Sequence, residues 1–139
     1  MRTVETSDGT RYLLVKRSSE SSRVRDPATG EEQYLPNDAL SPVDAGPLET
    51  AAAAVPDATR TLVTATHDER ALGLLLELRR RGPVAVRDLL GDYDLCESDV
   101  LGILTEYRVA GLVDEADVAG ERGYRLTAEG EEALDPLVD

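Results

Sequence analysis

Short runs of β-favouring residues, bounded by polar and turn residues, occupy the first forty positions. The clearest run covers residues 11–17 and follows the turn residues 7–9. Shorter runs cover 22–25 and 32–35, separated by Asp26–Gly30, where proline presets φ and glycine accepts a positive φ. These patterns predict a three-stranded antiparallel meander, with residues 2–5 as a candidate fourth strand. Because so few strands are marginal alone, we expect the sheet to pack on another surface.

Prolines and alanines dominate the segment that follows. Four prolines between positions 36 and 56 interrupt it, and the alanine-rich residues 48–55 predict a short helix. Asp57 is placed to cap a second helical stretch that ends near Ala65. We therefore expect a small antiparallel β-sheet domain over 1–40, a Pro/Ala-rich helical linker over 41–66 and a further domain over 67–139.

From residue 67 onward the apolar positions follow the 3.6-residue period of helices. A helix over 67–81 is predicted to begin with a capping box, in which Thr66 is the N-cap and Glu69 stands at N3, and to end at Gly82. The further predicted elements are a helix over 86–90 ending at Gly91, a turn over 92–95, a helix over 96–110, strands over 112–118 and 124–126 around a loop at 119–123, and a last helix capped by Thr127.

This order of helices followed by a hairpin and a last helix is that of a winged helix-turn-helix. The segment Leu95–Val113 resembles the recognition helix and its exit in MarR-like winged-helix regulators, and Gly123–Gly130 resembles their second wing strand and following helix. The resemblance covers residues 67–139 and implies DNA binding, although winged helices also serve as protein-binding modules. The expected fold class is therefore α+β: an N-terminal antiparallel β-meander, a helical linker and a C-terminal winged helix-turn-helix. The whole chain is also similar to a haloarchaeal protein family with a β-rich N-terminus.

The helix over 96–110 has two distinct faces at 100° per residue. The face predicted to be buried holds Val100, Ile103, Leu104 and Tyr107. The outward face holds Ser98, Gly102, Thr105 and Val109, with Leu101 beside it. Related regulators usually carry arginine where Gly102 and Glu106 stand here. The candidate DNA contacts on this helix are therefore Ser98, Leu101, Gly102 and Thr105, and the alternative is close packing of the same small face on a protein helix.

Three arginines complete the candidate DNA-binding set. Arg122 is expected at the tip of the wing and Arg125 on its return strand, where arginine reaches the minor groove or a phosphate. Arg87, near the start of the helix over 86–90, is placed for a phosphate. The alternative for each is a surface ion pair: with Glu121, Glu115 or Asp117 for the wing, and with Asp88 or Asp92 for Arg87.

Two other basic groups have simpler interpretations. The arginines at 79–81 are expected to complement the dipole of the helix that they end. Five basic residues on the N-terminal strands are expected to dock on the acidic C-terminal part, with nucleic acid as the alternative. They are Arg11, Lys16, Arg17, Arg23 and Arg25.

The charge balance bears on the expected DNA binding, because 15 basic and 28 acidic residues give a net charge of −13. Such a surface repels phosphates in dilute salt. Scarce lysine and few aromatic residues resemble haloarchaeal proteomes, and in molar salt the Debye length falls to about 3 Å. Residues 67–139 hold eighteen of the acids and eight of the bases, so the two halves differ in surface charge.

The chain has only one cysteine and one histidine, which limits its possible catalytic and metal-binding chemistry. With one cysteine, Cys96, and one histidine, His67, the chain offers no internal disulfide, no Cys/His metal cage and little for a His-based triad. Cys96 is expected to be a buried small residue. We expect no enzyme activity, no cofactor and no metal. We find no signal peptide and no apolar run long enough to span a bilayer, so a cytoplasmic protein without membrane contact is expected.

The favoured function is a DNA-binding transcriptional regulator of a halophile that binds double-stranded DNA as a homodimer. The N-terminal sheet, the helices within 48–66 or both are expected to form the dimer. The alternative is a winged-helix protein–protein interaction module without sequence-specific DNA binding, which would use the helix over 96–110.

Overall fold

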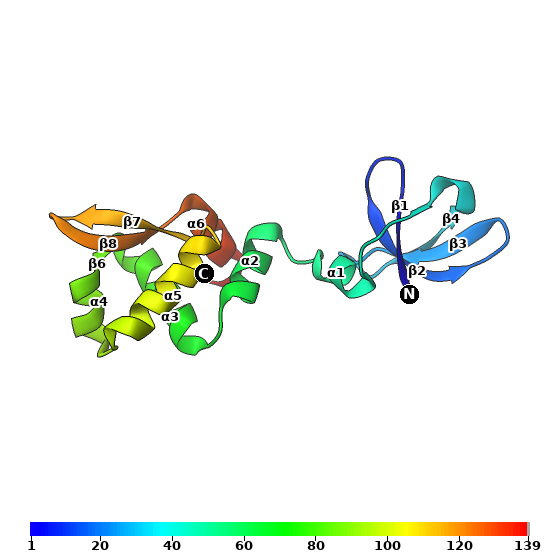
Figure 1. Cartoon of the computed structure of the whole chain (residues 1–139). Helices are drawn as coiled ribbons and strands as arrows, with labels where there is room; N and C mark the ends of the chain where they lie inside the picture. The colour runs from blue at the N-terminus through cyan, green and yellow to red at the C-terminus, as the bar shows by residue number, and fades with distance from the viewer. Residues whose placement is uncertain (139) are drawn as a thin grey trace. The chain divides into compact units, whose positions relative to one another are not determined.

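Five antiparallel strands build the first of two units, Met1–Pro56, in the computed structural model, which describes residues 1–138 (Figure 1). The strands lie in the order β4-β3-β2-β1-β5. Their bounds are β1 Arg2–Glu5, β2 Arg11–Arg17, β3 Ser21–Arg25, β4 Glu32–Pro36 and β5 Ser41–Pro42, with a 3-10 turn at Asn37–Ala39 and helix α1 at Pro47–Ala52. The predicted meander is confirmed, the candidate strand at 2–5 is present, and β5 was not expected.

Contacts between residues far apart in the sequence stabilise the first unit. Val4, Leu13 and Val24 are its buried apolar side chains. Helix α1 packs on β1 and β2, and the hydroxyls of Thr3 and Thr50 form a buried hydrogen bond of 2.7 Å. Because β5 pairs with β1 and α1 is fixed through Thr50, residues 41–52 belong to the sheet domain. This corrects the expectation of a separate linker over 41–66.

The second unit, Asp57–Asp139, contains the remaining helices and a three-stranded sheet. Its elements are α2 Asp57–Ala65, α3 Glu69–Arg81, β6 Val84–Ala85, α4 Val86–Tyr93, α5 Glu97–Val109, β7 Val113–Val118, β8 Glu121–Leu126, α6 Ala128–Leu134 and a 3-10 turn at Asp135–Leu137. The sheet order is β6-β8-β7, and both pairs are antiparallel. Helix α2, expected in the linker, packs on α6, where Thr59 Oγ1 donates to the carbonyl of Ala133 at 3.0 Å. The described chain is thus an α+β protein with six α-helices.

Several ends of elements in the second unit differ from the predictions. Helix α3 begins at Glu69, and its N-cap is Asp68, whose carboxylate accepts from the amide of Ala71 at 2.9 Å. Thr66, the expected cap, instead donates to the carbonyl of Leu62 and shares a hydrogen bond of 2.9 Å with the hydroxyl of Tyr107. Helix α4 continues through Gly91 to Tyr93, because the left-handed residue that ends it is Asp94.

The wing turn is shorter than predicted. Ala119 and Gly120 both have positive φ, 53° and 83°, which is typical of a two-residue hairpin turn. Strand β8 therefore begins at Glu121, and Arg122 lies within the strand opposite Asp117 instead of at the tip.

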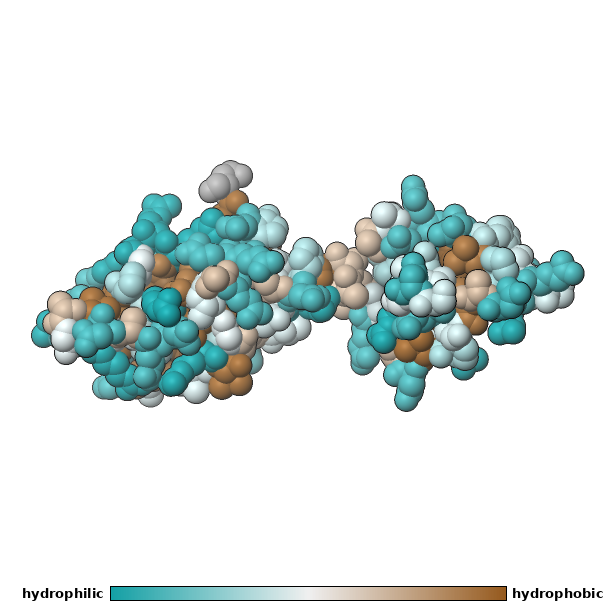
Figure 2. Space-filling model, turned by 90° about the horizontal axis from the view of Figure 1, so that it is seen from above, coloured by the Kyte–Doolittle hydropathy of each residue, from teal (hydrophilic) through white to brown (hydrophobic). Residues whose placement is uncertain are grey.

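The core of the second unit is made from leucine, valine and alanine, with Tyr107 and Tyr124 as its aromatic members. Polar residues cover most of the visible surface, and apolar residues reach it only in small patches (Figure 2). No helix within residues 1–138 has both the length and the apolar character needed to cross a membrane.

Candidate interaction surface

Helix α5 presents the face that the sequence predicted. Val100, Leu104 and Tyr107 are fully buried. Ile103, the fourth predicted core residue, is half-buried. Four residues of the opposite face are exposed: Ser98, Gly102, Thr105 and Val109. Val109 is 85% exposed, and a Cβ built on Gly102 would meet nothing within 4 Å. Leu101 beside them is half-buried against the core. We call Ser98, Leu101, Gly102, Thr105 and Val109 the α5 face; it is uncharged, and it is open except at Leu101.

Carboxylates flank the α5 face. Asp99 lies 3.8 Å from Arg70 of α3, and Glu106 lies 2.7 Å from the imidazole of His67. Over residues 97–126, which contain α5 and the hairpin, the sequence has seven carboxylates and three arginines. The surroundings of this helix are therefore acidic, and some of the carboxylates form ion pairs with nearby basic side chains.

Arg122 of the wing is held by the hairpin itself. Its guanidinium donates to Glu115 at 3.0 Å and to the hydroxyl of Tyr124 at 2.8 Å, and it lies over the Tyr124 ring at 5.7 Å. Tyr124 and then Glu115 raise the pKa of Arg122, which keeps it charged. Glu115 also accepts from Arg108 of α5 at 3.1 Å. This carboxylate therefore joins the helix to the wing.

The other two candidate arginines have carboxylate partners as well. Arg125 lies 3.8 Å from Asp114 across the hairpin. Arg87 of α4 forms an ion pair, as in the alternative interpretation, but its partner is Glu121 of β8 at 2.9 Å and not Asp88 or Asp92; Asp92 instead binds Arg81 at 2.9 Å. All three stay more than half exposed at the side chain.

The structure does not bring the wing arginines onto one surface. Side chains alternate between the faces of a strand, so Arg122 and Arg125, three positions apart on β8, point to opposite faces of the hairpin. Arg125 shares its face with Glu121, the partner of Arg87. Arg122 and Arg125 therefore do not form one continuous basic surface.

The remaining candidate residues have local roles. Cys96 is exposed at the start of α5, with its Sγ 3.1 Å from Ser98 Oγ, which corrects the expectation of a buried cysteine. The residues of this turn that pack against the core are instead the half-buried Tyr93 and Leu95. Arg79 connects α3 to Asp135 at 2.8 Å. No group of three or more histidine, cysteine, aspartate or glutamate side chains able to hold a metal ion is found among residues 1–138.

The N-terminal basic group is paired in part within its own sheet. Arg11 lies 3.1 Å from Glu5 and Arg23 lies 3.7 Å from Glu32. The first unit as a whole, residues 1–56, has six basic and nine acidic residues, so it is acidic despite these strands.

Sequence reasoning missed the central role of Glu115. It appeared only as one of three carboxylates available to Arg122, and its contact with Arg108 was not foreseen. The hairpin register carries a usable signal, because Glu115 lies directly opposite Tyr124, two residues from Arg122 on the same face of the hairpin.

The fold and surface define an acidic, two-unit α+β protein whose exposed α5 face is uncharged. The chain belongs to a family of unknown function, DUF7346, whose profile matches residues 1–138. No curated protein and no solved structure matches the chain.

Proposed function

We propose that residues 57–138 are a winged helix-turn-helix whose α5 face binds a protein partner. In this assignment α4 and α5 are the helix-turn-helix pair and β7–β8 is the wing. The observation that carries the proposal is the open, uncharged α5 face, rimmed by carboxylates, with each nearby arginine already paired. The role is one of recognition and not of catalysis.

Direct reading of DNA bases is poorly served by this helix. Base edges in the major groove are read best by arginine, lysine, asparagine or glutamine, and the α5 face has none of these. Ser98 and Thr105 are its only hydrogen-bonding side chains. Phosphates would also approach seven carboxylates over residues 97–126, and molar salt removes much of the favourable counterion release.

A protein helix suits the same face. Gly102 has open space where a Cβ would stand, so a partner backbone can approach closely there. Leu101 and Val109 add apolar surface that gains from burial. The rim of Glu97, Asp99 and Glu106 favours a partner helix whose small apolar stripe is flanked by arginine or lysine.

DNA binding remains the second candidate, favoured by the exposure of Arg87, Arg122 and Arg125. Exposed ion pairs are worth only about 0–1 kcal/mol, so these guanidinium groups can exchange carboxylates for phosphates. A regulator of this kind would hold DNA by the wing and α4, with α5 contributing shape and thymine-methyl contacts.

The experiment compares Gly102→Arg with Gly91→Arg, a matched change at an exposed glycine of α4 with equally open surroundings. Protein complexes are captured from cells of a halophile in molar salt, and duplex DNA binding is measured by selection from a random pool. We expect the wild type and Gly91→Arg to hold the same partner, Gly102→Arg to lose it, and no variant to enrich a DNA sequence.

Enrichment of a DNA motif by the wild type would overturn the proposal. The DNA candidate then predicts that Arg122→Ala and Arg125→Ala each lower the salt slope of binding by about 1, because each variant leaves one phosphate without its cation. Loss of the fold in Gly102→Arg, detected by circular dichroism, would contradict the open position of that residue.

A further inference from the structure

The outward face of helix α3 carries charges without partners in their own chain. Within residues 57–138, Arg80 alone among the arginines has no carboxylate within 4.0 Å. Glu69, near the other end of α3, also forms no ion pair in this described part of the chain. In a unit where the other arginines are paired, the unpaired Arg80 indicates a surface that meets something else, and Glu69 is a carboxylate of the same helix that is free to take part.

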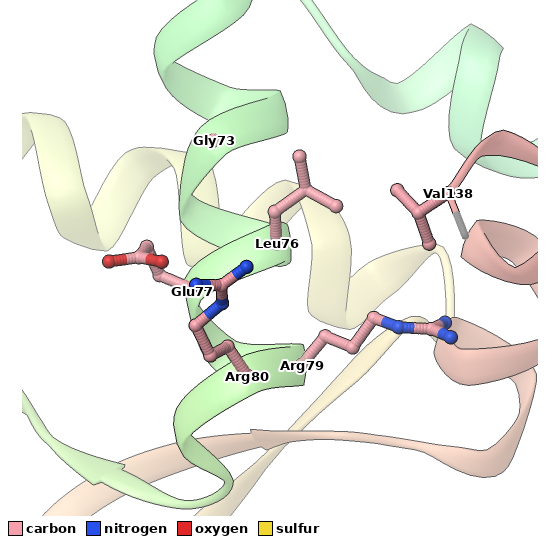
Figure 3. Close-up of a pocket in the computed structure, with 6 residues that line it drawn as sticks. All are labelled: Gly73, Leu76, Glu77, Arg79, Arg80 and Val138. Atoms are coloured by element: carbon pink, nitrogen blue, oxygen red, sulfur yellow. The ribbon is translucent and has the colours of Figure 1, made fainter.

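Two open hollows follow the same face of α3. One, of about 650 Å³, is lined by Gly73, Leu76, Glu77, Arg79, Arg80 and Val138, and Figure 3 shows Leu76 and Val138 projecting into it from α3 and the C-terminal segment. The other, of about 320 Å³, is lined by Arg70, Gly73, Leu74, Glu77, Tyr93 and Leu95. Gly73 and Glu77 belong to both, so the hollows adjoin along α3.

Gly73 lies at the centre of this face, and no contact in its own chain explains it. A Cβ built on Gly73 would meet nothing within 4 Å, and glycine in a helix interior costs up to about 1 kcal/mol relative to alanine. Absence of a side chain at this point allows a second helix to approach the α3 backbone.

The charged residues around Gly73 favour a second copy of α3 as the partner. When a second α3 helix runs antiparallel to the first, acidic residues of one helix lie opposite basic residues of the other. At 100° per residue, Glu69, Arg70, Glu77 and Arg80 lie on the outward side of α3 with Gly73. In an antiparallel pair of α3 helices centred near Gly73, Glu69 lies opposite the partner's Arg80, and Arg70 lies opposite the partner's Glu77. A parallel pair would instead place Glu69 beside the partner's Arg70, a register that the charge exchange described below distinguishes.

We propose that the outward face of α3 binds the same face of a second copy of this chain, antiparallel and across a two-fold axis near Gly73. An isologous contact of this kind uses one patch twice. A crossing angle near ~20° keeps both helices in contact over their length, and Leu76 enters the partner's hollow. The interface is small, so the dimer forms with a dissociation constant on the order of micromolar. The contact uses α3 and not the α5 face, although Arg70 also lies 3.8 Å from Asp99 on the rim of that face, and it does not depend on the function proposed for α5.

Sedimentation velocity of the full chain in molar salt, over a range of micromolar concentrations, tests the interface. We expect the wild type and Gly91→Arg to dimerise and Gly73→Arg to stay monomeric, since an arginine at the crossing point separates the helices. A monomeric wild type overturns the proposal. A dimer that survives Gly73→Arg also overturns it and points to the N-terminal sheet.

A charge exchange gives the sharper test. Arg80→Glu and Glu69→Arg each turn the attractive pair between residues 69 and 80 of opposite copies into a repulsive one. The two-fold axis repeats this pair, so each variant should weaken association by roughly tenfold. The double variant Glu69→Arg/Arg80→Glu should restore dimerisation, which a merely structural defect would not do. Failure of the double variant to recover, with both singles folded, refutes the antiparallel register.

Discussion

The same substitution, glycine to alanine, is expected to have opposite effects at two helix positions of the second unit. At Gly130 in α6, a Cβ would clash with the carbonyl oxygen of Leu112 and lie 3.0 Å from a methyl of Leu126. At Gly102 in α5, the Cβ would meet nothing within 4 Å. Gly102 lies in the interior of α5 and Gly130 in the first turn of α6, so the gain in helix preference is at most as large at Gly130, and the opposite sign comes from packing.

The expected loss of stability in Gly130→Ala depends on the groups that the new methyl displaces. The Leu112 carbonyl accepts the amide of Thr127 at 3.1 Å, and Thr127 caps α6 by accepting from the Gly130 amide at 3.0 Å. Displacing this carbonyl strains a packed site by about 1–3 kcal/mol and weakens a hydrogen bond worth about 1 kcal/mol. Helix preference returns up to about 1 kcal/mol, so Gly130→Ala should destabilise by roughly 2 kcal/mol, whereas Gly102→Ala should stabilise by about 0.5–1 kcal/mol.

Thermal denaturation in molar salt, followed by the helical circular dichroism signal, measures both variants. A change of about 2 kcal/mol in a unit of this size lowers Tm by roughly 10 °C, and Gly102→Ala should raise Tm by a few degrees. A Gly130→Ala variant as stable as the wild type would refute the close approach of Leu112. A destabilised Gly102→Ala variant would show that the α5 face packs within the chain.

Two further predictions concern the start of α3 and the buried tyrosine. Asp68→Ala should lower the free energy of unfolding by about 1 kcal/mol, because the N-cap hydrogen bond from the Ala71 amide is removed. An unchanged free energy of unfolding in urea denaturation would indicate that Thr66 is the N-cap instead. Burial raises the pKa of Tyr107 above 10.0, opposed by its hydrogen bond to Thr66. The unfolded tyrosine therefore loses its proton first, and stability should be constant below about pH 10 and fall above it. Tyr107→Phe should reduce this alkaline slope, and an unchanged slope in denaturation at stepped pH would contradict the assignment.

The periodicity of the sequence determined the long elements and the face of α5. Helices α3 and α5 were predicted within a few residues, because burial on one side imposes a period of 3.6 on the chain itself. Strands β2, β3 and β4 were predicted because turn residues bound their β-favouring runs. The end of α3 at Gly82 and the cap of α6 at Thr127 were also predicted, since both depend on neighbours within a few positions. The predicted homodimer, DNA contacts and halophilic setting remain predictions.

Tertiary structure decided what depends on partners far away in the chain. β5 and β6 have two residues each and exist as strands only through their pairing with β1 and β8, which no local pattern encodes. Thr66 fails as a cap because Tyr107, 41 positions later, takes part in its hydrogen bonding. Arg87 found Glu121 instead of the acids beside it, because the fold places α4 against β8. A charged side chain selects its partner by distance in space, and in a chain with 28 carboxylates the sequence alone offers each arginine several equivalent choices.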